Sequence, residues 1–530
     1  MNVVATSVFI GLFVFVTILG FLASRWKAAK LDSLNEWGLG GRRFGTWITW
    51  FLLGGDLFTA YTFIALPALV MGIGAMGFFA VPYSMLIYPL GFIIFPRLWA
   101  IARKHGYVTQ ADFVRGRYGS RFLALLIAIT GIVATMPYIA LQLIGIQVII
   151  GALGFQTTGL MGELPLLIAF AILAAYTYSS GLRAPAMIAI VKDVLVYVTI
   201  FAVLLVIPAQ LGGYEKIFAS APVENLLLKT PTPESARDFS NFLTLTIGSL
   251  LAIFLYPHAA TALFSASSGD TVRRNMIWLP AYSIVLGILA LLGFMALAAG
   301  VQQMPEYAPG FEQYGKNFAV PALMLHSFPD WFVGIAFAAI GIGALVPAAI
   351  MSIAAANLYT RNIHSEYINP NATPAEQTQV AKYVSLIVKV GALAFIFLLG
   401  NEYALNLQLL GGIWIIQTFP TVITGLYTRW FDHRALIAGW IAGIATGSWM
   451  AFNDGLKASF TIDIFGYEIP GYAALYAFLL NYTVAIAGTL IVRALKLRAL
   501  PDATSDAEYL DEAEHSNTLQ PEAKSVITAE

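Results

Sequence analysis

The chain contains no cysteine among its 530 residues. This absence excludes disulfide bonds, thiolate-bound metal ions and cysteine nucleophiles. Charged residues are also scarce, at 11% of the chain, whereas soluble domains carry about 25%. Hydrophobic residues make up 59% and the mean hydropathy is +0.76, so a water-soluble fold has no place to bury so much apolar surface. The composition therefore predicts a protein that spans a membrane.

The sequence also lacks the motifs by which several other classes of membrane protein work. It has no His-Glu-x-x-His zinc motif and no repeated Asp-rich magnesium motif, one of which a membrane enzyme would need. It has no repeated filter or pore segment of the kind that builds a channel. A transporter-like sensor would carry a signalling domain, and only about 30 residues follow the last apolar run. The interpretation is a non-enzymatic carrier with no cofactor and no nucleic-acid partner, and a nutrient receptor that does not transport is the alternative left open.

Long apolar runs recur along the whole chain. The first, Val3 to Leu22, contains no charged residue and is long enough to cross a ~30 Å hydrocarbon core as a helix. Thirteen runs are predicted to be transmembrane helices, near residues 3–24, 46–75, 77–99, 121–153, 162–181, 186–210, 240–266, 275–299, 331–360, 380–400, 403–428, 435–452 and 470–494.

Lysine and arginine are distributed unequally between the loops that join these runs. With the N-terminus outside, alternate threading puts 21 of them on the cytoplasmic side and five outside. The positive-inside rule favours this threading, which also places the C-terminus in the cytoplasm. The end of the chain, from Leu500 to Glu530, holds eight acids and one lysine, and is predicted to be a solvated, disordered tail. The expected location is the plasma membrane, which in a bacterium is the inner membrane.

Two places inside the predicted spans interrupt the helical pattern. The segment Gly54 to Pro67 begins Gly-Gly-Asp, which puts Asp56 in the middle of an otherwise uncharged span. The second interruption is Tyr256-Pro257-His258, where the proline removes a backbone donor. Broken helices free backbone carbonyls and N–H groups near the bilayer midplane, where carriers bind cations and anions. Simple packing roles for Asp56 and His258 are the alternative.

A further polar pair, Lys192 and Asp193, lies in the predicted span 186–210. Neighbouring residues of a helix point in different directions, so each is expected to find its own partner. The alternative for Lys192 is that its side chain extends to the cytoplasmic interface.

Together these segments resemble the sodium:solute symporter family over nearly the whole chain, about residues 40 to 495. Within that family the chain is most similar to the bacterial monocarboxylate permease branch. The residues that carry the resemblance are the broken segment Gly54 to Pro67, the loop Tyr107 to Tyr118, the turn Gly181 to Pro185, the stretch Pro257 to Ala266, the run Ala348 to Ser352, Gly425-Leu426-Tyr427, and the pairs Ala438-Gly439 and Ala442-Gly443.

The resemblance implies an all-α polytopic membrane protein with a leucine-transporter-type fold, in which ten core helices form two inverted repeats of five. The expected organisation is a leading transmembrane helix and cytoplasmic loop in residues 1–45, the transport core in 46–430, two peripheral helices in 431–498 and the acidic tail in 499–530. Such a carrier is expected to be a monomer or a weak oligomer whose partners are the lipid bilayer and a small solute.

The resemblance also implies a site for a coupling cation. Sodium in this family is bound by carbonyls of core helix one and hydroxyls of core helix eight, which correspond here to Gly55, Phe58, Ala349 and Ser352. The adjoining hydroxyl position is Ile353 in this chain, so one of the oxygen ligands that a hard cation needs is missing.

Two features could compensate for the missing ligand. The carboxylate of Asp56 could complete a sodium site. Alternatively a protonatable side chain, Asp56 or Lys192 beside Asp193, could take the place of the ion. Coupling to Na⁺ and coupling to H⁺ therefore both stay open.

The solute is expected to be small and anionic. The second half of core helix one begins near residues 59–62, and the positive end of its dipole suits one carboxylate. Within the predicted spans arginine occurs only at the ends, where it cannot pair with a second carboxylate near the middle, which favours lactate, pyruvate, alanine, acetate or propionate. Another small solute, such as an amino acid or a pantothenate-like acid, is the alternative. The residues expected to bind the solute are Thr59, Ala60, Tyr61, Thr62, Gln142, Tyr256, His258, Trp414 and Gln417.

Overall fold

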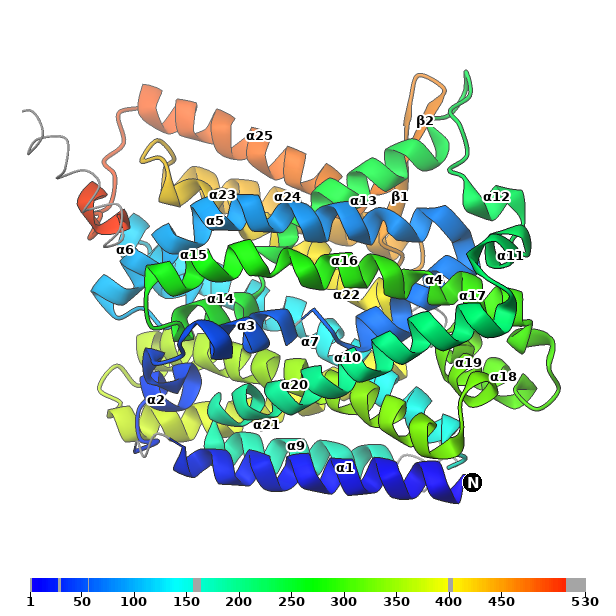
Figure 1. The fold of residues 1–530 in the computed structure, drawn as a ribbon. Coiled ribbons are helices and arrows are strands. Elements are labelled where there is room, and N and C mark those ends of the chain that lie inside the picture. Colours follow the sequence, from blue (N-terminus) through cyan, green and yellow to red (C-terminus); the bar gives the residue numbers. More distant parts are fainter. Residues whose placement is uncertain (1, 27–29, 56, 156–163, 399–403, 511–530) are drawn as a thin grey trace, which may run out of the picture.

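The computed structural model describes residues 2–26, 30–55, 57–155, 164–398 and 404–510. Most of the described residues are helical, and the long helices run side by side across the molecule (Figure 1). Helices of the first half are α1 (Val3–Leu22), α2 (Leu34–Leu39), α3 (Thr46–Gly55), α4 (Leu66–Ile73), α5 (Ala80–His105), α6 (Gln110–Tyr118), α7 (Arg121–Ala152), α9 (Leu164–Ser180), α10 (Arg183–Leu211), α11 (Tyr214–Ala219), α12 (Val223–Leu226), α13 (Arg237–Ile253) and α14 (Pro257–Ser265).

The second half of the chain is also helical apart from one β-hairpin. Its helices are α15 (Gly269–Trp278), α16 (Pro280–Ala290), α17 (Leu292–Ala299), α18 (Ala308–Tyr314), α19 (Ala319–Ser327), α20 (Asp330–Tyr359), α21 (Pro374–Leu398), α22 (Ala404–Ile415), α23 (Phe419–Val422), α24 (His433–Asn453) and α25 (Ala473–Ala494). The hairpin, which the all-helical expectation omits, pairs β1 (Ser459–Ile464) with β2 (Tyr467–Tyr472) in antiparallel register between α24 and α25.

Ten helices of the described chain are long and apolar enough to cross a membrane, or eleven if the bent pair α13–α14 is one span. The thirteen predicted spans differ from this number for two reasons. The helical stretch Tyr61–His105 takes in one predicted span and part of another, and α9 is a shorter apolar helix. Within that stretch the chain reverses at Gly74, whose φ is +61°, and Tyr83 returns to donate a hydrogen bond to the hydroxyl of Tyr61 at 3.0 Å.

The loops gather at the two ends of the helices as the predicted threading requires. At the end predicted to be cytoplasmic, Arg117 donates to the carbonyl of Gly425, and Arg121 pairs with Glu366. At the opposite end, Asn2 donates to Asp330 at 2.7 Å. Residues of loops that lie far apart in sequence but on one predicted side thus meet on one side of the molecule.

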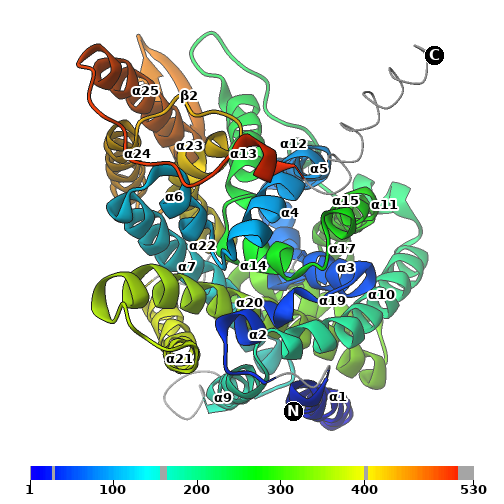
Figure 2. The ribbon, with the colours of Figure 1, turned by 90° about the vertical axis from the view of Figure 1, so that its left-hand side faces the viewer.

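Helix α20 forms the centre of the bundle. It packs against α1, α7, α10, α14 and α21, and nearly all of its apolar length is buried. Many of its residues are alanine and glycine, which allow neighbouring helices to approach closely. Figure 2 shows α24 and α25 on one flank of this bundle and α1 with α9 at another edge.

The first part of the predicted tail is folded against the cytoplasmic end. Asp502 pairs with Arg117 at 2.5 Å and with Arg429 at 2.9 Å. His105 and Glu508 form a hydrogen bond of 3.0 Å, which lowers the pKa of the Glu508 carboxyl. The prediction of a disordered tail is therefore wrong for residues 499–510, because their acids find basic partners on α5, α6 and the segment after α23. Residues 511–530 lie outside the described residues.

Candidate cation and solute site

The ammonium group of Lys192 occupies the break in the first core helix. Its Nζ donates hydrogen bonds to the backbone carbonyls of Gly55 and Phe58, the latter at 3.2 Å, and lies 3.1 Å from Oδ1 of Asp193. The side chains of Lys192 and Asp193 are fully buried. The lysine therefore faces the two carbonyls that the resemblance implied for sodium, and does not extend to the cytoplasmic interface.

The local sequence makes room for this ammonium. Helix α3 ends at Gly55, and a Cβ added there would lie only 2.8 Å from Nζ of Lys192. Gly55 is the last residue of α3 and Phe58 lies in the non-helical segment 57–59, and the carbonyls of both accept hydrogen bonds from Lys192 of α10. A larger residue at position 55 would therefore displace the end of the lysine side chain from the two carbonyls.

Asp193 has a second partner on α16. The hydroxyl of Tyr282 donates to Oδ2 of Asp193 at 2.6 Å. The ring of Tyr282 fills the space beside Gly54, where any side chain would overlap it, and lies 4.6 Å from the ring of Phe58. The expectation of separate partners is therefore only half right, because the flexible lysine side chain also reaches back to its neighbour. Tyr282 is a site residue that the sequence did not reveal.

The two predicted ligands on α20 are buried but bond to each other. Ser352 donates its hydroxyl to the carbonyl of Ala349 at 2.8 Å, a bond within one helical turn. Asp56, the remaining residue predicted to bind the coupling ion, lies outside the described residues. Its role stays a prediction.

A small enclosed cavity lies between the two helix breaks. Its volume is about 40 Å³, roughly three times the ~10–15 Å³ that one water needs by this measure. Tyr61 from the first break and Tyr256 with His258 from the second line it, so the structure brings these three predicted residues together. The cavity is also lined by residues that the sequence analysis missed, among them Tyr83, Tyr138 and Gln408.

Aromatic rings and polar atoms define the wall of this cavity at the second break. The ring of His258 lies 5.5 Å from that of Tyr138 and 5.2 Å from that of Tyr256. The Tyr256 hydroxyl donates to the carbonyl of Gln408 at 2.9 Å, which ties the break to α22. The Tyr256 and Tyr83 hydroxyls already donate within the protein, so the Tyr61 hydroxyl and the His258 imidazole are the groups here that can donate to a small anion.

The backbone N–H groups expected to receive the solute carboxylate are already bonded. Ala60 N–H donates to the side-chain oxygen of Gln142 at 3.1 Å, Tyr61 N–H to the hydroxyl of Thr59 at 3.0 Å, and Thr62 N–H to the carbonyl of Thr59 at 3.0 Å. The Thr62 hydroxyl donates to the carbonyl of Leu57. Gln142 thus holds the position in which a carboxylate oxygen was predicted, and these amides are not free in this structure.

Two predicted solute-binding residues lie away from the cavity. Trp414 donates through its indole to Ser448 of α24 at 3.1 Å. Gln417 donates to the carbonyl of Ile413 and accepts from Asn481 of α25 at 3.0 Å. Neither residue lines the cavity described above, because in a helix that is apolar all round the sequence does not distinguish a face toward a cavity from one toward peripheral helices. Their role in binding the solute stays a prediction.

Fold and site together define a class of protein, a carrier with two broken helices around a buried site. A model of the sodium:solute symporter family matches residues 37–443. The chain is 50% identical over 493 residues to a monocarboxylate transport permease protein of Rhizobium johnstonii, covering 92% of this chain and 96% of that protein. It is 36% identical over 433 residues to the uncharacterized symporter YodF of Bacillus subtilis, covering 81% of this chain and 84% of that protein. The chain belongs to the sodium:solute symporter family.

A solved structure supports the fold. The structure of a Na⁺-coupled sialic acid symporter, substrate-bound and outward-open, matches 94% of this chain and 98% of its own with a TM-score of 0.75 and 14% identity. At that identity the likeness concerns the fold, which is of the leucine-transporter type. The protein is a multi-pass membrane transporter, and its solute and coupling ion are considered next.

Proposed function

We propose that this protein takes up short monocarboxylates, such as lactate, pyruvate, acetate or propionate, across the bacterial inner membrane by symport with protons. The observation that carries the proposal is the buried ammonium of Lys192 on the carbonyls of Gly55 and Phe58. This ammonium carries the same unit charge as Na⁺, and the lysine gains or loses that charge when it binds or releases a proton.

The oxygen atoms around Lys192 argue against a second cation at the same place. A hard cation takes several oxygen ligands, and here two backbone carbonyls already bond the ammonium. The hydroxyl of Ser352 is directed to a carbonyl of its own helix. Placing Na⁺ beside a protonated Lys192 would also bring two like charges together in a low-dielectric interior.

Proton binding at Lys192 gives a simple coupling scheme. When protonated, the side chain links α10 to the end of α3 and to the segment that follows it, and it neutralises Asp193. Loss of the proton removes the charge that holds these carbonyls and leaves Asp193 to its bond with Tyr282. The first core helix is then free to change position, which is the motion that alternating access requires.

The solute class is supported by the size of the cavity and by a relative. About 40 Å³ between tyrosine rings suits a molecule of a few heavy atoms, and no arginine lines it to bind a second carboxylate. The relative from Rhizobium johnstonii is named a monocarboxylate transport permease protein. One carboxylate moved with one proton carries no net charge.

Sodium-coupled uptake of a small solute is the second candidate, because the family and the sialic acid symporter are both named for sodium. The two candidates differ in what drives accumulation. The test uses purified protein in proteoliposomes with labelled lactate, pyruvate or propionate as the solute. One set of vesicles has a more acidic outside and no sodium, and the other has more sodium outside and equal pH on both sides.

The proposal expects accumulation with the pH gradient alone and none with the sodium gradient alone. Lys192→Met is expected to abolish the accumulation that the pH gradient drives. Strict dependence on sodium in the wild-type protein would overturn proton coupling, and a lack of saturable counterflow for every short monocarboxylate would overturn the solute class.

A further inference from the structure

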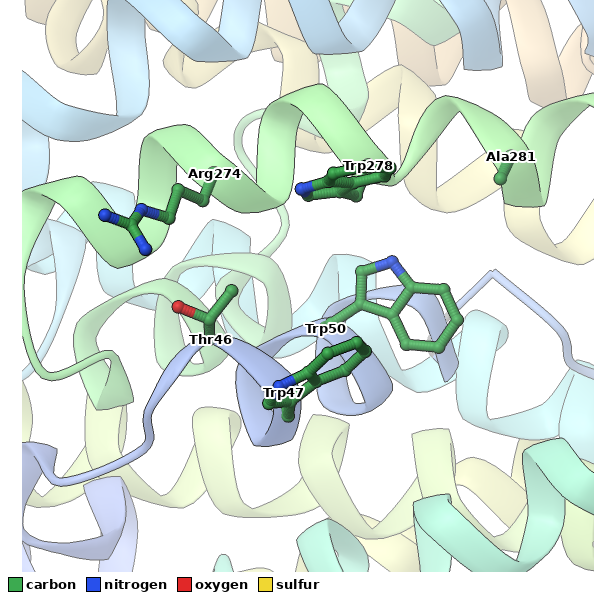
Figure 3. A pocket seen from close by; sticks show the side chains of 6 residues that line it. All are labelled: Thr46, Trp47, Trp50, Arg274, Trp278 and Ala281. Carbon is green, nitrogen blue, oxygen red and sulfur yellow. The ribbon is translucent and has the colours of Figure 1, made fainter.

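A groove on the outside of the bundle lies behind the cation site. Its volume is about 500 Å³, and it is bounded by α3 on one side and by α15 and α16 on the other. Its lining consists of three tryptophans, Trp47, Trp50 and Trp278, together with Thr46, Arg274 and Ala281 (Figure 3). Trp47 is 75% exposed and Trp278 is 65% exposed, so in the membrane these indoles contact lipid or whatever occupies the groove.

The polar groups of the groove lie at one end. Figure 3 shows the guanidinium of Arg274 and the hydroxyl of Thr46 at that end, with the indoles of Trp50 and Trp278 further along. This is the end predicted to be cytoplasmic, because α3 and α15 both begin there and are joined by a backbone hydrogen bond from Ser267 to the carbonyl of Phe44 at 2.9 Å. The groove is therefore apolar toward the middle of the bilayer and cationic at its cytoplasmic rim.

That distribution matches an amphipathic molecule with one anionic end. Among the described residues, Arg274 forms an ion pair with Asp270 at 2.8 Å. A guanidinium has five N–H donors, so this pair leaves donors that can bind a phosphate. Tryptophan is favoured at the level of lipid headgroups, where its ring is apolar and its N–H polar. The cytoplasmic leaflet supplies anionic phospholipids, and each basic residue near it contributes about 1 kcal/mol to their binding.

The groove is connected to the cation site by a short series of contacts. The ring of Trp50, in the groove wall, lies 4.8 Å from the ring of Tyr282. Tyr282 in turn donates to Asp193, the partner of Lys192. A molecule wedged between α3 and α15 would therefore hold the helix that ends at Gly55.

We propose that the groove binds one anionic phospholipid of the cytoplasmic leaflet, with its phosphate on Arg274 and an acyl chain between the indoles. The bound lipid fixes α3 against α15 and so sets how readily the first core helix moves. The groove thus acts as a regulatory lipid site, and its binding can be measured without any assumption about solute or coupling ion.

The test is lipid retention by the full-length protein in detergent, read by native mass spectrometry. The probes are phosphatidylglycerol and phosphatidylcholine with the same acyl chains, each added at equal concentration. The wild-type protein is expected to retain one phosphatidylglycerol in preference to phosphatidylcholine. Arg274→Gln is expected to lower that preference about fivefold, as the loss of one basic residue near the lipid implies.

Two further variants separate the groove from general attraction to basic residues. Trp278→Leu should weaken retention of both lipids, since it removes an indole of the wall. Lys104→Gln changes an exposed lysine at the cytoplasmic end of α5, away from the groove, and should behave as the wild type. Equal retention of phosphatidylglycerol by Arg274→Gln and by Lys104→Gln would overturn the proposal. Displacement of phosphatidylglycerol from the wild-type protein by an equal concentration of oleate would overturn it as well.

Discussion

The two broken helices leave backbone carbonyls without helical hydrogen bonds in the same apolar bundle, but different side chains donate to these carbonyls. At the first break the ammonium of Lys192 bonds the carbonyls of Gly55 and Phe58. At the second break, where α13 and α14 meet at 46°, the neutral side-chain amide of Gln110 donates to the carbonyl of Phe254 at 3.1 Å.

The two breaks differ in whether the hydrogen-bond donor that stabilises them depends on a proton. An amide donor keeps its hydrogen bond at every pH, so Gln110 can only stabilise the second break. An ammonium donor disappears when it loses its proton, so the bond at the first break is conditional. Under the proposed proton symport, ion coupling would lie at the first break, and the hydrogen bond from Gln110 would link α6 to the second break.

Removing the charge at the first break should have the largest effect. Lys192→Met leaves Asp193 buried without its cation, and breaking a buried pair in this way costs about 3–5 kcal/mol. We expect a clear fall in the thermal unfolding temperature of the purified protein together with loss of concentrative uptake.

The double variant Lys192→Met with Asp193→Asn provides the matched control. It removes both charges, so it should recover much of the lost stability without recovering accumulation. Recovery of gradient-driven uptake in the double variant would show that the lysine supports the fold and does not couple the ion.

Crowding the ammonium without removing it should have the next largest effect. In Gly55→Ala the new Cβ would lie 2.8 Å from Nζ of Lys192, and forcing atoms into a packed site costs about 1–3 kcal/mol. We expect slower uptake and a shifted pH profile. Gly45→Ala is the control, because no atom lies within 4 Å of the Cβ position there. Equal pH profiles for the two variants would contradict the close approach of the lysine.

Removing the neutral donor at the second break should cost a similar free energy but change transport less. Gln110→Leu leaves the buried carbonyl of Phe254 without its donor, for about 1–3 kcal/mol. Uptake should fall with stability, while its dependence on pH and sodium stays that of the wild type. A change in cation dependence would remove the distinction between the two breaks.

The smallest effect is expected on α20. Ser352→Ala removes a hydroxyl that bonds within its own helix, so the cation dependence of uptake should not change. Uptake assays with sodium replaced by choline test this directly. A strong loss of activity restricted to the alanine variant in sodium would place a sodium ion at Ser352 after all.

Much of the fold could be predicted from the sequence, because hydropathy and charge act locally. The helix breaks could also be located, since Gly-Gly-Asp and a proline interrupt a helix whatever surrounds them. The sequence could not predict whether a polar side chain within a span points toward the cavity or toward a neighbouring helix. Trp414 and Gln417 are as polar as Tyr256, yet they face α24 and α25, and only the packing of those helices decides this.

The sequence by itself determined that the chain enters a membrane and where two helices are interrupted, and it predicted which ends of the helices meet the cytoplasm. Membrane entry and orientation follow from the free energies of apolar and charged segments in water and lipid, and the interruptions follow from the backbone properties of glycine and proline. The tertiary structure alone decided which group fills the first break. Lys192 lies more than 130 residues from Gly55 and Phe58, and three backbone and carboxylate oxygens surround its ammonium only once α10 packs against α3.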